Sequence, residues 1–248
     1  MKENSVSNLE APKARKSPLW RVLFMLILPP ILITVVITVF ALGYSVFGNT
    51  GEVDIDAAIA ENIAYLFVFN HILVFCVLLW FLRIDGLKLA DIGFRLPDDG
   101  AKGIMIDVGL AVISTAIVIA LLTNILPLFE DANNAAPRLA DQEHPLGNVL
   151  LFALFSGVIV ASFVEESVYR GYGITRLNVR WGIVAAVLVT SVLFGPLHYG
   201  FGVVGIFRSM FQGLVMALLF VRSRSLLGPM TAHSLTNLYS ELSAFEII

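Results

Sequence analysis

Residues 19–47 read LWRVLFMLILPPILITVVITVFALGYSVF, and this stretch decides the class of fold because Arg21 is its only charged residue. About 20 predominantly apolar residues are enough for an α-helix to cross the hydrocarbon core of a bilayer. The stretch is also longer than the apolar core of a cleavable signal peptide. We therefore predict a disordered cytoplasmic tail at residues 1–18 and then a spanning helix. Pro29 and Pro30 should kink this helix at a point where neighbouring helices can satisfy the freed carbonyls.

The same kind of apolar stretch recurs along the whole chain. Of the 248 residues, 58% are hydrophobic and 14% are charged, whereas soluble domains are about 45–50% apolar and about 25% charged. We predict an all-α, polytopic transmembrane bundle of about seven helices that forms one unit over residues 19–248. The helices are expected at residues 19–47, 63–82, 103–129, 148–177, 182–198, 205–221 and 226–242.

The segments that connect these helices alternate in charge. Lys and Arg gather before the first helix and again at 83–102, while the segments at 52–61 and 130–143 are mainly acidic. Cytoplasmic loops of membrane proteins carry an excess of Lys and Arg. We therefore predict a multi-pass protein of a prokaryotic cell membrane with its N-terminus in the cytoplasm. The formal net charge of -3 argues against nucleic acid as a partner.

Ionisable residues inside the apolar stretches cost about 2.5–3.5 kcal/mol each on insertion scales, so each one suggests a function. The densest group is VEESVYR at residues 164–170. Glu166 and Arg170 stand at i and i+4, and they can form an ion pair along one helix face. That pair leaves Glu165 as a carboxylate without a charge partner of its own, which suits a general base.

Two histidines lie in later helices. His198 closes the sequence FGPLH at residues 194–198, while His233 and Asn237 stand at i and i+4 on one helix face. At about 1.5 Å of rise per residue, Glu165, His198 and His233 lie within about 10 Å of one another in depth, a difference that tilt can absorb. We therefore predict that they share an intramembrane polar cavity.

Together these residues form three motifs in order on three apolar helices. The pattern resembles the signature of the CAAX-protease and bacteriocin-processing membrane endopeptidases, the family of the type II CAAX prenyl endopeptidase. The resemblance covers about residues 147–245. Its motifs are Glu165-Glu166-x-x-x-Arg170, Phe194-x-x-x-His198 and His233-x-x-x-Asn237.

The resemblance implies an intramembrane glutamic protease that hydrolyses peptide bonds without a metal or another cofactor. Glu165 would deprotonate a water that His198 helps to hold, and His233 and Asn237 would stabilise the oxyanion of the tetrahedral intermediate. Glu166, Arg170 and Phe194 would support these four residues. The partners would be the lipid bilayer and a peptide or membrane-protein substrate, either prenylated or not, and the oligomeric state is open.

Other interpretations of the same residues remain open at the level of sequence. Glu165, His198 and His233 could instead bind Zn²⁺ through imidazole and carboxylate groups, although no H-E-x-x-H pair is present. The chain could also be a non-catalytic immunity or partner-binding protein of the membrane. For Asn70 and His71 we predict only helix–helix hydrogen bonds.

Overall fold

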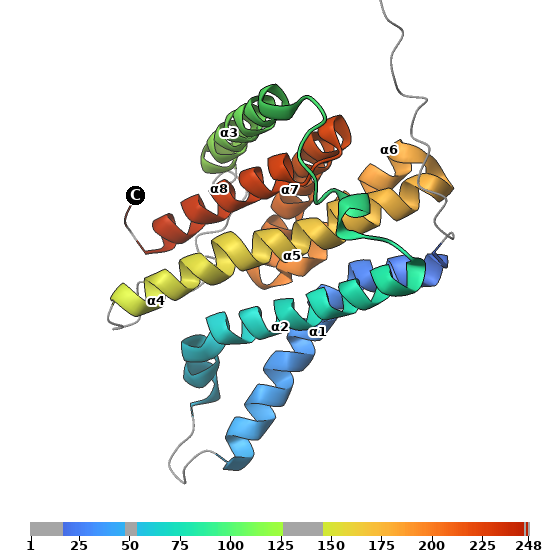
Figure 1. The fold of residues 1–248 in the computed structure, drawn as a ribbon. Helices are drawn as coiled ribbons and strands as arrows, with labels where there is room; N and C mark the ends of the chain where they lie inside the picture. Colours follow the sequence, from blue (N-terminus) through green and yellow to red (C-terminus); the bar gives the residue numbers. More distant parts are fainter. Residues whose placement is uncertain (1–16, 48–53, 126–145, 246, 248) are drawn as a thin grey trace, which may run out of the picture.

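The computed structural model describes residues 17–47, 54–125, 146–245 and 247, and within these ranges the elements are all helical (Figure 1). Most of the predicted tail, the predicted end of the third helix at 129 and the acidic segment at 130–143 lie outside the described residues. The elements in chain order are α1 (Leu19–Phe47), α2 (Ile55–Asp85), the 3₁₀ turn η1 (Leu89–Ile92), α3 (Gly100–Ile125), α4 (Leu146–Ala153), the π-helix η5 (Leu154–Ala161), α5 (Ser162–Glu166), the π-helix η6 (Ser167–Ile174), α6 (Thr175–Phe194), the 3₁₀ helix η7 (Gly195–Phe201), α7 (Gly202–Ser223) and α8 (Leu227–Ala244).

Two helix boundaries show what hydropathy alone detects. α1 has the predicted limits, because its apolar stretch begins and ends sharply. α2 begins at Ile55, a full two turns before the predicted start at 63, because the side chain of Asp54 caps the helix by accepting from the backbone N–H of Ala57. The first two turns of α2 contain Asp56 and Glu61, and the prediction therefore took them as part of an acidic loop.

The segment from α4 to η6 runs through the middle of the molecule (Figure 1). It contacts α1 and α2 on one side and α8 on the other, and α3 packs against α8 further out. Gly182, with φ 77° and ψ 167°, interrupts α6 at the predicted start of the fifth helix. The chain therefore changes direction where a residue without a Cβ can take a left-handed φ.

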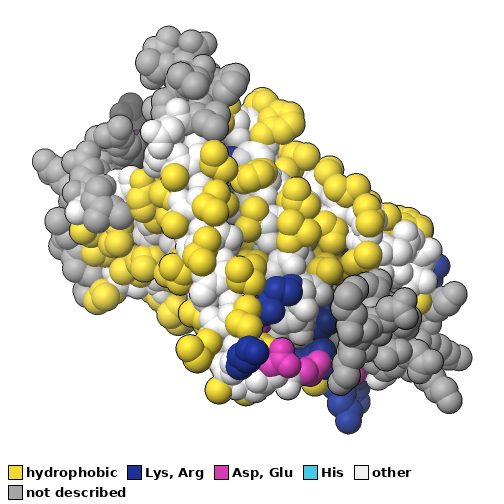
Figure 2. All heavy atoms as spheres, turned by 90° about the horizontal axis from the view of Figure 1, so that it is seen from above, with side chains coloured by type: hydrophobic (Ala, Val, Ile, Leu, Met, Phe, Trp, Pro, Cys, Tyr) yellow, Lys and Arg dark blue, Asp and Glu magenta, His cyan; other side chains and the backbone are white. Residues whose placement is uncertain are grey.

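Four described segments are long and apolar enough to cross a membrane, namely Leu19–Phe47, Ile55–Asp85, Gly100–Leu121 and Leu150–Ser223. Their length and composition indicate an integral membrane protein. The last segment contains several helices, and the predicted number of about seven spanning helices remains a prediction. Figure 2 shows hydrophobic side chains spread over one face of the molecule, with most of the visible charged side chains toward one margin.

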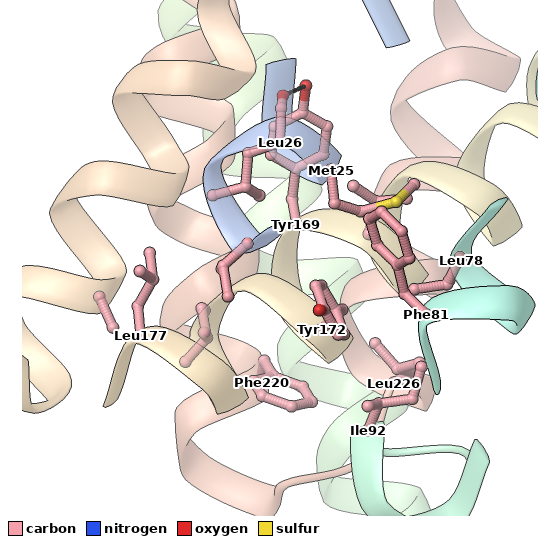
Figure 3. Packing of buried hydrophobic residues seen from close by; sticks show 14 of the residues in the cluster. Met25, Leu26, Leu78, Phe81, Ile92, Tyr169, Tyr172, Leu177, Phe220 and Leu226 are labelled. Carbon is pink, nitrogen blue, oxygen red and sulfur yellow. Dashed lines mark hydrogen bonds between the residues drawn. The ribbon is translucent and has the colours of Figure 1, made fainter. Parts of the chain in front are cut away.

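A hydrogen bond joins α1 to η6 in the core, next to the prolines of α1. Because Pro30 has no N–H, it cannot donate the usual i to i−4 hydrogen bond to the carbonyl of Leu26. The hydroxyl of Tyr169 in η6 donates to this carbonyl at 2.9 Å, as the dashed line in Figure 3 shows. Leu26 and Tyr169 are both fully buried. This contact is of the kind expected from the sequence, where neighbouring helices satisfy carbonyls that prolines free.

A buried polar cluster fastens the start of α1 to the rest of the bundle. The carboxylate of Asp85, at the end of α2, accepts from Ser17 and Arg21, and from the hydroxyl of Tyr172 at 3.1 Å. Arg176 in turn donates to the Ser17 hydroxyl at 2.8 Å. Ser17, at the end of the predicted tail, is therefore held in the folded structure with only 3% of its surface exposed.

Candidate active site

Glu165 and Glu166 lie in a short α-helical segment between two π-helices. A π-helix displaces the usual i to i−4 hydrogen bonds, and such turns occur often at functional sites. In η5 the carbonyls of Gly157 and Val158 accept hydrogen bonds from α8, from the Asn237 amide at 2.8 Å and from the Ser234 hydroxyl at 2.8 Å. The two bonds fix α8 against the segment that carries the glutamates.

Glu166 is the centre of a fully buried charge network. Its Oε1 atom accepts from Nη1 of Arg170 at 2.9 Å, the i, i+4 ion pair expected from the sequence. The same oxygen lies 2.8 Å from Nδ1 of His233. Arg170 also donates through Nη2 to the carbonyl of Gly213 at 2.9 Å. Glu166 and Arg170 thereby connect the site segment to both α7 and α8.

This network determines which nitrogen of His233 carries a proton. The Glu166 carboxylate, which is paired with Arg170, is an acceptor, so Nδ1 of His233 must be the donor. In the neutral imidazole, Nε2 is then left with a lone pair. That atom lies 3.8 Å from Oε2 of Glu165, beyond hydrogen-bond distance. The geometry confirms that Glu165 and His233 face each other across a small gap.

Glu165 has two oxygens in different surroundings. Oε1 lies 3.1 Å from Nε2 of His71, which reaches it from α2. Oε2 is buried and accepts no hydrogen bond from the part of the chain that the structure describes. Only 6% of the residue is exposed. The site therefore holds one engaged and one available carboxylate oxygen.

His198 lies in η7, one turn after Phe194, and its φ of -103° and ψ of 24° interrupt the helical geometry. Its Nδ1 lies 3.3 Å from the carbonyl oxygen of Phe194. The ring is half-buried and packs against the ring of Phe194, which also contacts His233. His198 thus belongs to the same cluster of side chains.

Phe194 is the apolar centre around which these groups pack. Its ring is fully buried and lies 5.0 Å from the ring of His198 and 5.8 Å, edge-on, from the ring of His233. The guanidinium of Arg170 stands 4.4 Å from the Phe194 ring centroid, within cation–π range. The Phe194 ring thus packs against both imidazoles and the Arg170 guanidinium.

Most of the site residues predicted from the sequence thus lie close together in the structure. Glu165, Glu166 and Arg170 meet the two histidines around Phe194, whereas Asn237 lies one turn beyond His233 and bonds Gly157 in the neighbouring segment. His71 was predicted to make a helix–helix hydrogen bond and does so, but its partner is Glu165. Within the described ranges, no group of three His, Cys, Asp or Glu side chains is arranged to hold a metal ion.

Sequence comparison with known families agrees with this geometry. Residues 147–239 match the family Type II CAAX prenyl endopeptidase Rce1-like. The match confirms the resemblance seen in the three motifs, and it implies a protease that acts on a peptide substrate. The Rce1-like segment extends from α4 into α8 and contains every motif residue. No curated protein and no solved structure matches the chain.

His71 lies outside the Rce1-like segment. α1, α2 and α3 precede it, so His71 reaches the motif residues from outside the match. A pocket of about 290 Å³ borders His71, and its other lining side chains are apolar, among them Phe75, Phe163 and Val164. The polar cavity predicted from the sequence is not confirmed by this apolar pocket.

Proposed function

We propose that the protein is an intramembrane endopeptidase in which Glu165 activates a water molecule for attack on a peptide bond. The observation that supports this most directly is the state of Glu165 Oε2. This buried oxygen accepts no hydrogen bond among the described residues and lies 3.8 Å from Nε2 of His233. A buried acceptor without a donor costs a fold about 1–3 kcal/mol, and a catalytic role is one reason for a protein to keep such a group.

In the proposed reaction, Glu165 Oε2 takes a proton from water while the oxygen of that water bonds to the carbonyl carbon of the peptide. The carbonyl becomes an oxyanion, which donors in the site stabilise. The proton then passes to the peptide nitrogen, the C–N bond breaks, and a carboxylic acid and an amine leave. No covalent enzyme intermediate is required, so no nucleophilic Ser or Cys is needed.

His233 can stabilise the oxyanion only if Nε2 also carries a proton, because its Nδ1 proton is committed to Glu166. The Glu166 carboxylate accepts from Nδ1 at 2.8 Å and so fixes the ring with Nε2 toward Glu165. Arg170 in turn holds that carboxylate in place through its bond to Oε1. We infer that Glu166 and Arg170 act through His233, while His198 holds the water. Asn237 adds a second donor through the amide proton that is not bonded to the Gly157 carbonyl.

A cleavage assay with defined peptides tests this function. The purified protein in lipid nanodiscs is incubated with a farnesylated Cys-a-a-X peptide and with the same peptide without its lipid, and products are identified by mass spectrometry. We expect cleavage that falls about 10²-fold or more in Glu165→Gln, since general base catalysis contributes about 10²–10⁴-fold. The matched control is Glu61→Gln, an exposed carboxylate in α2. Full activity in Glu165→Gln would refute the mechanism.

A further inference from the structure

The residue of greatest interest outside the Rce1-like segment is His71 in α2. It is buried, with 4% of its surface exposed, and both ring nitrogens have partners. Nδ1 lies 2.7 Å from the carbonyl oxygen of Phe67, one turn earlier in the same helix, and Nε2 lies 3.1 Å from Oε1 of Glu165. We propose that His71 is a positioning residue that selects the oxygen of Glu165 that acts as the base.

The Phe67 contact fixes the proton arrangement of the imidazole. A backbone carbonyl can only accept, so Nδ1 of His71 must carry a proton. The hydrogen bond between Nε2 and Glu165 Oε1 then holds one further proton between these two atoms. Either the imidazolium donates to a carboxylate, or a protonated Glu165 donates to a neutral ring.

In both arrangements Oε1 of Glu165 is engaged with His71 and is not available to take a proton from water. Oε2 is left, and this is the oxygen that faces His233. When the shared proton lies on His71, Glu165 is a carboxylate and is ready to act. The His71 imidazole therefore sets both the orientation of Glu165 and its readiness, provided that the proposed function holds.

α2 is packed firmly enough for this role. Val74, one turn beyond His71, is buried with 1% exposure, and the rings of Phe75 and Phe163 are 5.2 Å apart between α2 and α5. The other titratable or charged groups at Glu165 come from the remaining elements of the site. They are Glu166, Tyr169 and Arg170 from α5 and η6, His198 from η7 and His233 from α8.

A purely structural helix–helix bond would have different consequences, which suitable variants separate. Gln places an amide N–H₂ near the position of Nε2, so His71→Gln can keep a hydrogen bond to Glu165 but cannot carry the shared proton. Val74→Ala is the matched control, because it weakens the packing of α2 and leaves the His71 contact in place. His71→Ala removes the bond altogether.

The test measures cleavage of the farnesylated peptide together with the infrared band of the Glu165 carboxyl, assigned by difference from Glu165→Gln. For His71→Gln we expect kcat to fall about 10-fold or more with KM within about threefold, since base positioning acts on the chemical step. The acid limb of the pH–rate profile should also move, because the Gln amide cannot hold the proton that His71 and Glu165 share. The Glu165 band should shift in His71→Gln and stay unchanged in Val74→Ala.

The proposal would be overturned if His71→Gln and His71→Ala both kept the kcat, the pH profile and the infrared band of the wild-type protein. If kcat in the His71 variants falls only as far as their loss of thermal stability explains, as expected for Val74→Ala, the proposal is also overturned. The contact between His71 and Glu165 is then a structural bond. If the wild-type protein cleaves no peptide, the proposed function fails. The infrared band then still decides whether His71 and Glu165 share a proton, so the two failures are distinguishable.

Discussion

The buried ion pair between Glu166 and Arg170 gives a prediction whose size follows from the structure. Arg170→Met removes the 2.9 Å bond to Glu166, the 2.9 Å bond to the Gly213 carbonyl and the contact with the Phe194 ring. Both charged side chains have 0% exposure, so the substitution leaves a carboxylate buried without its cation. Breaking a buried pair in this way costs about 3–5 kcal/mol.

The assay is thermal unfolding of the purified protein in detergent, monitored by tryptophan fluorescence. For a chain of this size each kcal/mol corresponds to about 2–4 °C, so Tm should fall by about 6–20 °C in Arg170→Met. The matched control is Arg95→Met, because Arg95 pairs with Asp98 at the surface, where both side chains are more than 40% exposed. An exposed pair is worth about 0–1 kcal/mol, and the control should lose little.

A double variant separates stability from catalysis. Replacing a whole buried pair by apolar residues is often neutral, so Glu166→Leu combined with Arg170→Met should recover most of the lost Tm. It should nevertheless stay inactive, because His233 loses the acceptor that orients its ring. The reasoning is refuted if Arg170→Met is no less stable than Arg95→Met, or if the double variant is no more stable than Arg170→Met.

Two further predictions concern the hydrogen bond between Tyr169 and α1 and the need for a metal ion in cleavage. Tyr169→Phe should cost about 1–3 kcal/mol in unfolding experiments, because the Leu26 carbonyl is left buried without a donor. In a Pro30→Ala background, which restores a backbone N–H to that carbonyl, the cost should shrink, and an equal cost in both backgrounds would count against this explanation. Cleavage of the farnesylated peptide should be unchanged by a metal chelator, whereas activity that is lost and then restored by Zn²⁺ would favour the zinc interpretation.

The sequence predicted those parts of the molecule that depend on composition and on short-range spacing. The limits of α1 follow from apolar length alone, and the pairing of Glu166 with Arg170 follows from helical geometry. The break at Gly182 falls where the fifth helix was predicted to begin. The family resemblance followed from three ordered motifs, and the match over residues 147–239 confirms it.

The remaining features depend on contacts that spacing does not encode. The π-helices on either side of α5 have no composition signal, yet one of them, η5, presents the carbonyls that accept from Asn237 and Ser234. His71 stands outside every motif, and only the packing of α2 against α5 brings it to Glu165. A possible signal was a histidine inside an apolar helix, but a packing role explains such a residue equally well.

Glu165 is proposed to act as the base in peptide hydrolysis inside the membrane. The most direct measurement compares all protein N-termini and C-termini in cells that carry the wild-type chain and in cells that carry Glu165→Gln at the same membrane level. We expect a set of new termini on membrane-associated proteins or peptides that depends on wild-type Glu165. Identical termini in both cell populations, together with full biological function of Glu165→Gln, would contradict it.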